Sequence, residues 1–190
     1  MGTNLITPPT LLPVEVCEQK DHCGVDGTDQ DNLIQSCIKD ATDYVQRASG
    51  RQLMTATYRK SLDEFPDEII LDHPPLQSIT TITYTDTDGE SQTLDASDYQ
   101  VDTHSIKGKV VPAYGTTFPN TRAIPNAVQV TYVCGYTSRS NVPDAAKRAI
   151  RFLAAHYFEN REAVVTGTIT STIPLAVDSL IASISIPEVI

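Results

Sequence analysis

Apolar residues recur at every third or fourth position between residues 33 and 48, which places them along one face of an α-helix. They are Leu33, Ile34, Cys37, Ile38, Ala41, Tyr44, Val45 and Ala48. Asp29 and Asp31 are favourable at the positive N-terminal end of a helix, and Gly50 suits the left-handed residue that follows a last turn. The pattern therefore predicts a helix over about residues 30–49.

Three further helices are indicated by prolines in first-turn positions and by apolar spacing. Pro13 opens and Gly24 closes a short helix, Pro143 opens one that ends near Arg161, and Pro174 opens a short last one. The apolar side of the helix after Pro143 consists of Ala145, Ala146, Ala149, Ile150, Leu153, His156 and Tyr157, and that of the last helix of Val177, Leu180 and Ile181.

Between these helices the pattern changes to short β-branched and aromatic runs separated by Pro, Gly and Asp, which is typical of antiparallel strands. Alternation predicts strands over residues 54–62, 79–85 and 128–132. Shorter candidates lie at Ile69–Leu71, Gln92–Leu94, Tyr99–Asp102 and Lys109–Pro112.

The order of helix, strands and helix predicts an α+β fold. We expect the N- and C-terminal helices to pack together, with an inserted antiparallel β region of about six or seven strands. Residues 1–190 are expected to form a single domain, with helical parts at about 13–50 and 143–182, the β insertion at about 52–134 and an extended C-terminal tail at 183–190.

Composition places the chain among globular proteins, because 40% of its 190 residues are hydrophobic and 20% are charged. No stretch approaches the roughly 18 consecutive apolar residues of a membrane helix. The first residues lack the basic start and apolar run of a secretory signal. We therefore expect a cytoplasmic chain without a membrane partner, in which Cys17, Cys23, Cys37 and Cys134 are reduced thiols.

The charge is 14 basic against 24 acidic side chains, a net −10 that divides into −5 for residues 1–50, −4 for 51–142 and −1 for 143–190. Such a surface repels phosphate, so the sequence disfavours a protein that grips nucleic acid through a basic patch. Any contact with DNA is expected to be non-adhesive.

The acidic residues around Gly89 can be interpreted as a calcium loop or as a turn. Asp86, Asp88 and Asp95 have neither the ligand spacing of such a loop nor its flanking helices, whereas Asp88-Gly89 between two strands is a common hairpin signal. We favour the hairpin turn. The acidic run Asp63–Glu68, around Phe65-Pro66, is likewise interpreted as a solvated turn, and the acidic residues 26–31 as the start of the long helix.

Other candidate sites are incomplete. Cys17, His22 and Cys23 lack the fourth ligand of a structural zinc site, and His156 lies in an aromatic helical stretch that is typical of packing. No nucleophile elbow, phosphate loop or dinucleotide fingerprint occurs. The sequence therefore predicts no catalytic residue, no metal and no cofactor, and the chain is not expected to be an enzyme.

Three stretches together resemble one protein family. The first runs from Asp31 to Leu53, through Ser49-Gly50-Arg51; the second comprises Leu71–Ile79, Ile82–Tyr84, Asp86–Gly89 and Tyr99–Asp102; the third comprises Val133–Tyr136, Val142-Pro143, Ala149-Ile150, Tyr157–Ala163, Ile173-Pro174 and Val177. In order and spacing they are similar to the head-tail connector or head-completion adaptor proteins of long-tailed double-stranded DNA phages and related prophages.

The resemblance implies a structural virion protein that forms a ring, twelve-fold in the virion, between the capsid portal and the tail or next neck component. Its partners would be other copies of itself, the portal protein, a downstream neck or tail-completion protein, and double-stranded DNA passing non-specifically through the lumen. It would be located at the head-tail junction, and in the host cytoplasm during assembly. We also expect self-association through the two long apolar stripes, because a sheet and two short helices cannot fully cover both.

The C-terminal tail is the candidate partner-binding segment. Ile184 and Ile186 alternate with polar residues as in an added strand, and Val189 and Ile190 are also apolar. These four residues are expected either to dock on the portal or to pack against the chain's own sheet or a neighbouring subunit. Two other functions remain open for the chain, a sheet-based host-surface or protein-binding module and a small metal-dependent hydrolase.

Overall fold

The computed structural model describes residues 2–160 and 175–186. It divides into two compact units. The β unit consists of Met1–Thr10 and Thr55–Tyr136, and the helical unit of Leu11–Met54 and Thr137–Ile190. The threonine-rich stretch 164–172 and Pro174, the expected start of the last helix, lie outside the described residues.

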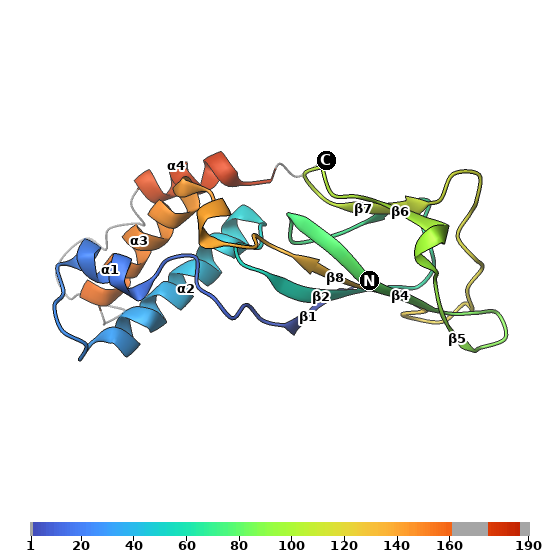
Figure 1. The fold of residues 1–190 in the computed structure, drawn as a ribbon, viewed down its shortest axis with the longest axis horizontal. Coiled ribbons are helices and arrows are strands. Elements are labelled where there is room, and N and C mark those ends of the chain that lie inside the picture. Colours follow the sequence, from blue (N-terminus) through green and yellow to red (C-terminus); the bar gives the residue numbers. More distant parts are fainter. Residues whose placement is uncertain (1, 161–174, 187–190) are drawn as a thin grey trace. The chain divides into compact units, whose positions relative to one another are not determined.

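The helical unit contains four α-helices in its described part: α1 (Val16–Cys23), α2 (Asp31–Ser49), α3 (Asp144–Glu159) and α4 (Leu175–Ile184). A 3₁₀ turn, η2 (Arg139–Asn141), precedes α3. As Figure 1 shows, α2 and α4 both pack against α3. The expected packing of the N- and C-terminal helices is therefore confirmed.

Capping fixes the ends of the first two helices. At the start of α1, the side chains of Glu15 and Glu18 form a reciprocal capping box. Gly24 after α1 has φ 64° and Gly50 after α2 has φ 72°, the left-handed conformation that glycine adopts without a steric penalty. The two helix ends expected at Gly24 and Gly50 are thus confirmed.

The apolar stripes of α2 and α3 form the core of the helical unit. Ile34, Ile38, Ala149 and Ile150 are each 0% exposed, covered within the chain itself. The expectation that these stripes need a second copy to cover them is wrong, because α2, α3 and α4 bury one another's apolar faces. The buried residues of the two stripes are therefore not available for self-association.

The β unit contains two antiparallel sheets. The larger has the strand order β1-β2-β8-β4-β5, formed by β1 (Gly2–Thr7), β2 (Ala56–Leu62), β8 (Val128–Cys134), β4 (Leu76–Thr85) and β5 (Ser91–Thr93). The smaller has the order β3-β7-β6, formed by β3 (Ile69–Ile70), β7 (Lys109–Pro112) and β6 (Tyr99–Asp102), the last preceded by η1 (Ala96–Asp98). The α+β class is confirmed, with eight strands in the described residues.

Alternation along β8 builds the core between the sheets. Val128, Val130, Tyr132 and Cys134 are all buried, whereas the intervening residues are half-buried. They pack with Ile82 and with other apolar residues of the β unit in one cluster. Side chains of period two on a central strand therefore hold the two faces of this unit together.

Three further features differ from the sequence prediction. The first short helix was expected to open at Pro13 but begins at Val16, with Glu15 as its N-cap. Residues 2–7 form an edge strand, β1, paired with β2, so the β unit also includes the N-terminal segment and not only the stretch between the helices. Ser183 and Ile184 were expected in an extended tail but form the end of α4. The extended conformation is therefore wrong for these two residues.

Candidate interaction surfaces

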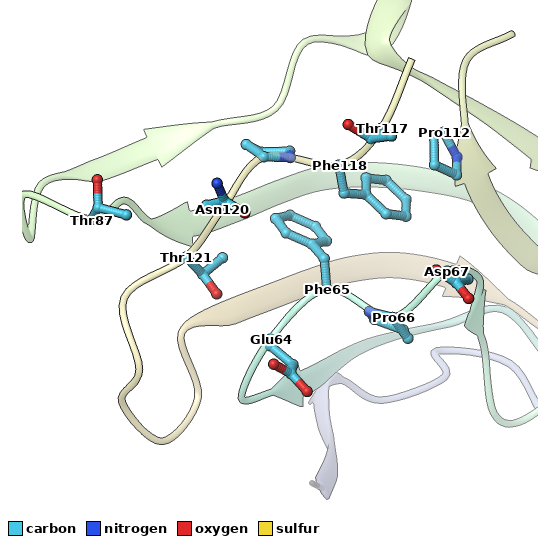
Figure 2. A pocket seen from close by; sticks show the side chains of 11 residues that line it. Glu64, Phe65, Pro66, Asp67, Thr87, Pro112, Thr117, Phe118, Asn120 and Thr121 are labelled. Atoms are coloured by element: carbon cyan, nitrogen blue, oxygen red, sulfur yellow. The ribbon is translucent and has the colours of Figure 1, made fainter. Parts of the chain in front are cut away.

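An aromatic groove opens at one end of the β unit. Phe65 and Phe118 stack with ring centroids 4.7 Å apart, and Phe65 also meets Tyr84 edge-on at 5.5 Å. Figure 2 shows both phenylalanine side chains among the residues that line a cavity of about 480 Å³. Its lining consists of Glu64, Phe65, Pro66, Asp67, Thr87, Pro112, Thr117, Phe118, Pro119, Asn120 and Thr121.

The two walls of the groove come from distant parts of the sequence. One wall is the turn 63–68 between β2 and β3, and the other is the long connection 113–127 between β7 and β8. The Asp63 carboxylate accepts a hydrogen bond from the Asn126 backbone N–H at 2.9 Å, which ties the turn to the connection. The Arg122 N–H donates to the Thr85 carbonyl at 3.1 Å, which ties the connection to β4.

The rim of the groove is acidic. Glu64 and Asp67 are exposed, and neither makes a hydrogen bond or ion pair within the described parts of the chain. The neighbouring Glu68 is paired instead with Lys109 at 3.2 Å. Phe65 and Phe118, next to carboxylates that are unpaired in the described residues, suit a ligand that carries both an apolar group and a positive charge.

The turn 63–68 is exposed as expected, but its phenylalanine has a second role. The sequence indicated a solvated acidic turn, which the exposure of Glu64, Asp67 and Glu68 confirms. Phe65 instead turns inward and stacks on a residue 53 positions later in the chain, Phe118. A phenylalanine next to Pro66 in an otherwise charged turn was the only local signal of this groove.

The C-terminal candidates lie against the end of α2. The Arg51 Nε donates to the Ile184 carbonyl at 2.6 Å, and the Ile186 N–H donates to the Ser49 carbonyl at 3.1 Å. Ile184 is only 9% exposed, and Ile186 is half-buried near Gly50. Val189 and Ile190 lie outside the described residues. The structure thus brings Ile184 and Ile186 onto their own helical unit, and a role of all four in partner binding stays a prediction.

The residues 86–89 form a hairpin tip between β4 and β5, as the sequence predicted. The Asp86 carboxylate accepts hydrogen bonds from the backbone N–H groups of Asp88 at 3.0 Å and Glu90 at 2.9 Å, and from Gln92 Nε2 at 2.8 Å. The bond from Gln92, followed by those from the backbone, lowers the pKa of Asp86. Both carboxylate oxygens are used to hold the turn.

Comparison with known proteins identifies the family. A family model described as head completion protein matches residues 14–180. The chain belongs to the head completion protein family. The resemblance of the three sequence stretches to this group of virion proteins is therefore confirmed.

Solved structures share the fold of this head completion protein. A chain in the neck of an empty GTA particle computed with C6 symmetry has a TM-score of 0.82 and 21% identity. One in the virion of a native gene transfer agent particle has 0.80 and 21%, and one in the neck of a native GTA particle computed with C12 symmetry has 0.79 and 22%. Each match covers 100% of this chain and 98% of the other. No curated protein matches the chain.

The cysteine and histidine candidates of the head completion protein have separate partners. Cys17 is exposed beside Glu15, whereas Cys23 accepts a hydrogen bond from Gln19 and the His22 ring lies 5.8 Å from that of Phe152. His156 Nδ1 lies 3.3 Å from Asn160 Nδ2. Within residues 2–160 and 175–186, no three His, Cys, Asp or Glu side chains are grouped to hold a metal ion, and no helix is long and apolar enough to cross a membrane.

Proposed function

We propose that this head completion protein forms an oligomeric ring, twelve-fold in the virion, between the capsid portal and the next neck or tail component. The match of its family model over residues 14–180 carries the proposal. The similar chains come from necks computed with C6 and C12 symmetry, which supports a ring. The protein acts structurally and without catalysis, at the head-tail junction of the virion after assembly in the host cytoplasm.

Double-stranded DNA passes through the centre of the proposed ring without being gripped. The net charge of −10 supports this part of the proposal. Both units are acidic: the β unit has 5 basic and 11 acidic side chains, and the remaining 9 basic and 13 acidic side chains belong to the helical unit. A wall that repels phosphate leaves the duplex free to slide, since retention on proteins depends on cationic contacts with phosphate.

The ring and its portal contact are tested with the full chain. Light scattering and negative-stain microscopy of the purified protein, alone and with the cognate portal, are expected to show a ring and a stable ring-portal complex. A chain that remains monomeric at high concentration in the presence of the portal refutes the ring. Retention of duplex DNA on the purified ring at physiological salt refutes the non-adhesive channel.

The C-terminal segment is the proposed portal contact. Ile184 and Ile186 anchor it on the helical unit through the Arg51 and Ser49 hydrogen bonds, and Val189 and Ile190 are the residues proposed to bind the portal. Strand addition of such a segment uses main-chain hydrogen bonds for affinity and alternate side chains for specificity.

Two truncations separate the anchor from the contact. Ending the chain after Ile186 keeps both anchoring hydrogen bonds, so folding and ring formation should be unchanged while portal binding is lost. Ending it after Ala182 also removes Ile184 from its buried site, and losing one buried isoleucine costs roughly 1.5–3 kcal/mol. A chain ending at Ile186 that still binds the portal as tightly as the full chain refutes the proposed contact.

A further inference from the structure

The loop 103–108 between β6 and β7 is held at both ends. At its start, the Asp102 carboxylate accepts hydrogen bonds from the backbone N–H groups of His104 at 2.8 Å and Ser105 at 3.1 Å. At its end, the Gly108 carbonyl accepts the Leu71 N–H at 2.8 Å, and Gly108 is buried against Leu76. The loop therefore presents its middle residues from a fixed frame, which lowers the entropy that binding would cost.

The middle of this loop presents an apolar side chain next to a cation. Ile106 is 56% exposed, and Lys107 is exposed without a hydrogen bond or ion pair in the described residues. The β unit has only five basic side chains, and two of them, Lys60 and Lys109, are already paired with carboxylates. Lys107 is thus an uncommon free cation on an acidic unit.

The aromatic groove is complementary to this loop in both respects. Phe65 and Phe118 offer an apolar surface on which an aliphatic side chain can pack, and the groove of about 480 Å³ exceeds the size of one isoleucine side chain. Glu64 and Asp67 at its rim are free of partners in the described residues, as Lys107 is. Unpaired charges of opposite sign on the two surfaces favour their association.

A chain cannot place this loop in its own groove. Asp102 pairs with Lys109 at the loop end of the β6–β7 hairpin, whereas Tyr99 pairs with Pro112 at the other end, and Pro112 lines the groove. The two pairs are three residues apart along β6, about 10 Å at the rise of a strand. Because the loop and the groove lie at opposite ends of one hairpin, the occupant has to come from another molecule.

We propose that loop 103–108 of one copy docks in the aromatic groove of the next copy, with Ile106 against Phe65 and Phe118 and Lys107 paired with Glu64 and Asp67. The contact joins two different patches of the same chain, which is the heterologous kind of interface that generates a ring when its rotation closes. The inference rests on the proposed ring, and names the surfaces that join its subunits.

Charge reversal with rescue tests this contact on the full chain. Lys107→Glu and the double variant Glu64→Lys/Asp67→Lys are each expected to raise the subunit dissociation constant about tenfold or more, since each puts like charges face to face. Combining all three changes restores opposite charges and should recover assembly. Lys39→Glu and Asp21→Lys, at exposed positions of the helical unit, are the matched controls and should assemble as the original chain does.

Direct proximity is read by coupling amines to carboxylates with a carbodiimide. In a mixture of isotopically light and heavy protein, the expected product is a mixed-label peptide that links Lys107 to Glu64 or Asp67. Rings that tolerate both single-sided reversals, or a combined variant as weak as its parents, overturn the contact while leaving the ring intact. An original chain that never associates, even with the cognate portal, overturns the ring and this contact together.

Discussion

Gly108→Ala is expected to destabilise the β unit, because the added methyl group has no space. A Cβ at this position would lie 2.9 Å from Leu76 Cγ and closer still to Leu76 Cβ and Cδ2. These distances are roughly 0.5 Å or more inside the optimum of about 3.5–4.0 Å for two carbon atoms. The Leu76 side-chain tip can rotate away, but its Cβ is fixed by the backbone of β4, where Leu76 pairs with Cys134 of β8.

Relief of the clash therefore requires a backbone shift. Overpacking of this kind costs typically about 1–3 kcal/mol. The smaller conformational freedom of alanine in the unfolded chain returns about 0.4–1 kcal/mol. We expect a net loss on the order of 1–2 kcal/mol, measured as a lower urea midpoint at unchanged slope.

The double variant Leu76→Ala/Gly108→Ala identifies the atom responsible. Leu76→Ala removes Cγ and Cδ2 but retains Cβ, so Gly108→Ala should remain costly in that background. Gly2→Ala is the matched control, since a Cβ there meets nothing within 4 Å and should leave stability within about 0.5 kcal/mol of the original. Gly108→Ala at full stability refutes the steric argument. No cost when Leu76 is already alanine assigns the clash to the Leu76 side-chain tip and refutes the role of its Cβ.

Three further predictions concern the core and the cysteines. Tyr132→Phe loses the hydrogen bond from the hydroxyl to the Asp72 carbonyl at 3.1 Å and should lower the free energy of unfolding in urea by about 0.5–1.5 kcal/mol. Burial raises the pKa of Tyr132 far above its usual value, so the same variant should leave the alkaline absorbance change of the folded protein unaltered. Burial raises the pKa of Cys134 to about 12. A thiol reagent at mildly alkaline pH should therefore label exposed Cys17 first and Cys134 only after unfolding. Early labelling of Cys134 contradicts its burial. Burial raises the pKa of Asp72, but hydrogen bonds led by that from Thr3 outweigh burial, so the pKa is lowered overall. Asp72 therefore stabilises the fold above about pH 4 and loses that contribution as the pH falls through its lowered pKa. Thr3→Val should raise the Asp72 pKa in an NMR titration, and an unchanged pKa contradicts the proposed cause.

Local periodicity predicted most of the elements because each has its own apolar face. The stripe of α2 and its closing Gly50, and the alternation along β8, are visible within a few residues of sequence. β1 lacks such a signal. All of its residues but one are exposed, and it is held by pairing with β2 and by the hydrogen bond from the Thr3 hydroxyl to Asp72 at 2.6 Å, so no apolar period marks it.

The C-terminal residues carried two competing periods. Ile184 and Ile186 have the period of two of a strand, which led to the extended prediction. Val177, Ile181 and Ile184 have the spacing of a helix, and all three are buried in the structure. The helical period prevailed because it continues the face that α4 already packs against α3.

The groove and the loop were not predictable in this way, since interface surfaces carry no period. The apolar stripes of the long helices suggested assembly surfaces, yet Ile34 and Ile150 are fully covered within one chain. Interfaces between separately folded subunits are about as apolar as the rest of a protein surface, so hydrophobic patterning finds cores and overlooks them. Lys107 and Glu64 are distinguished by being charges without a partner among the described residues, the first on a fixed loop and the second beside a cavity that two phenylalanines line. That property depends on contacts between residues far apart in the sequence, such as Phe65 with Phe118 and Asp63 with Asn126, and it exists only after folding has brought them together.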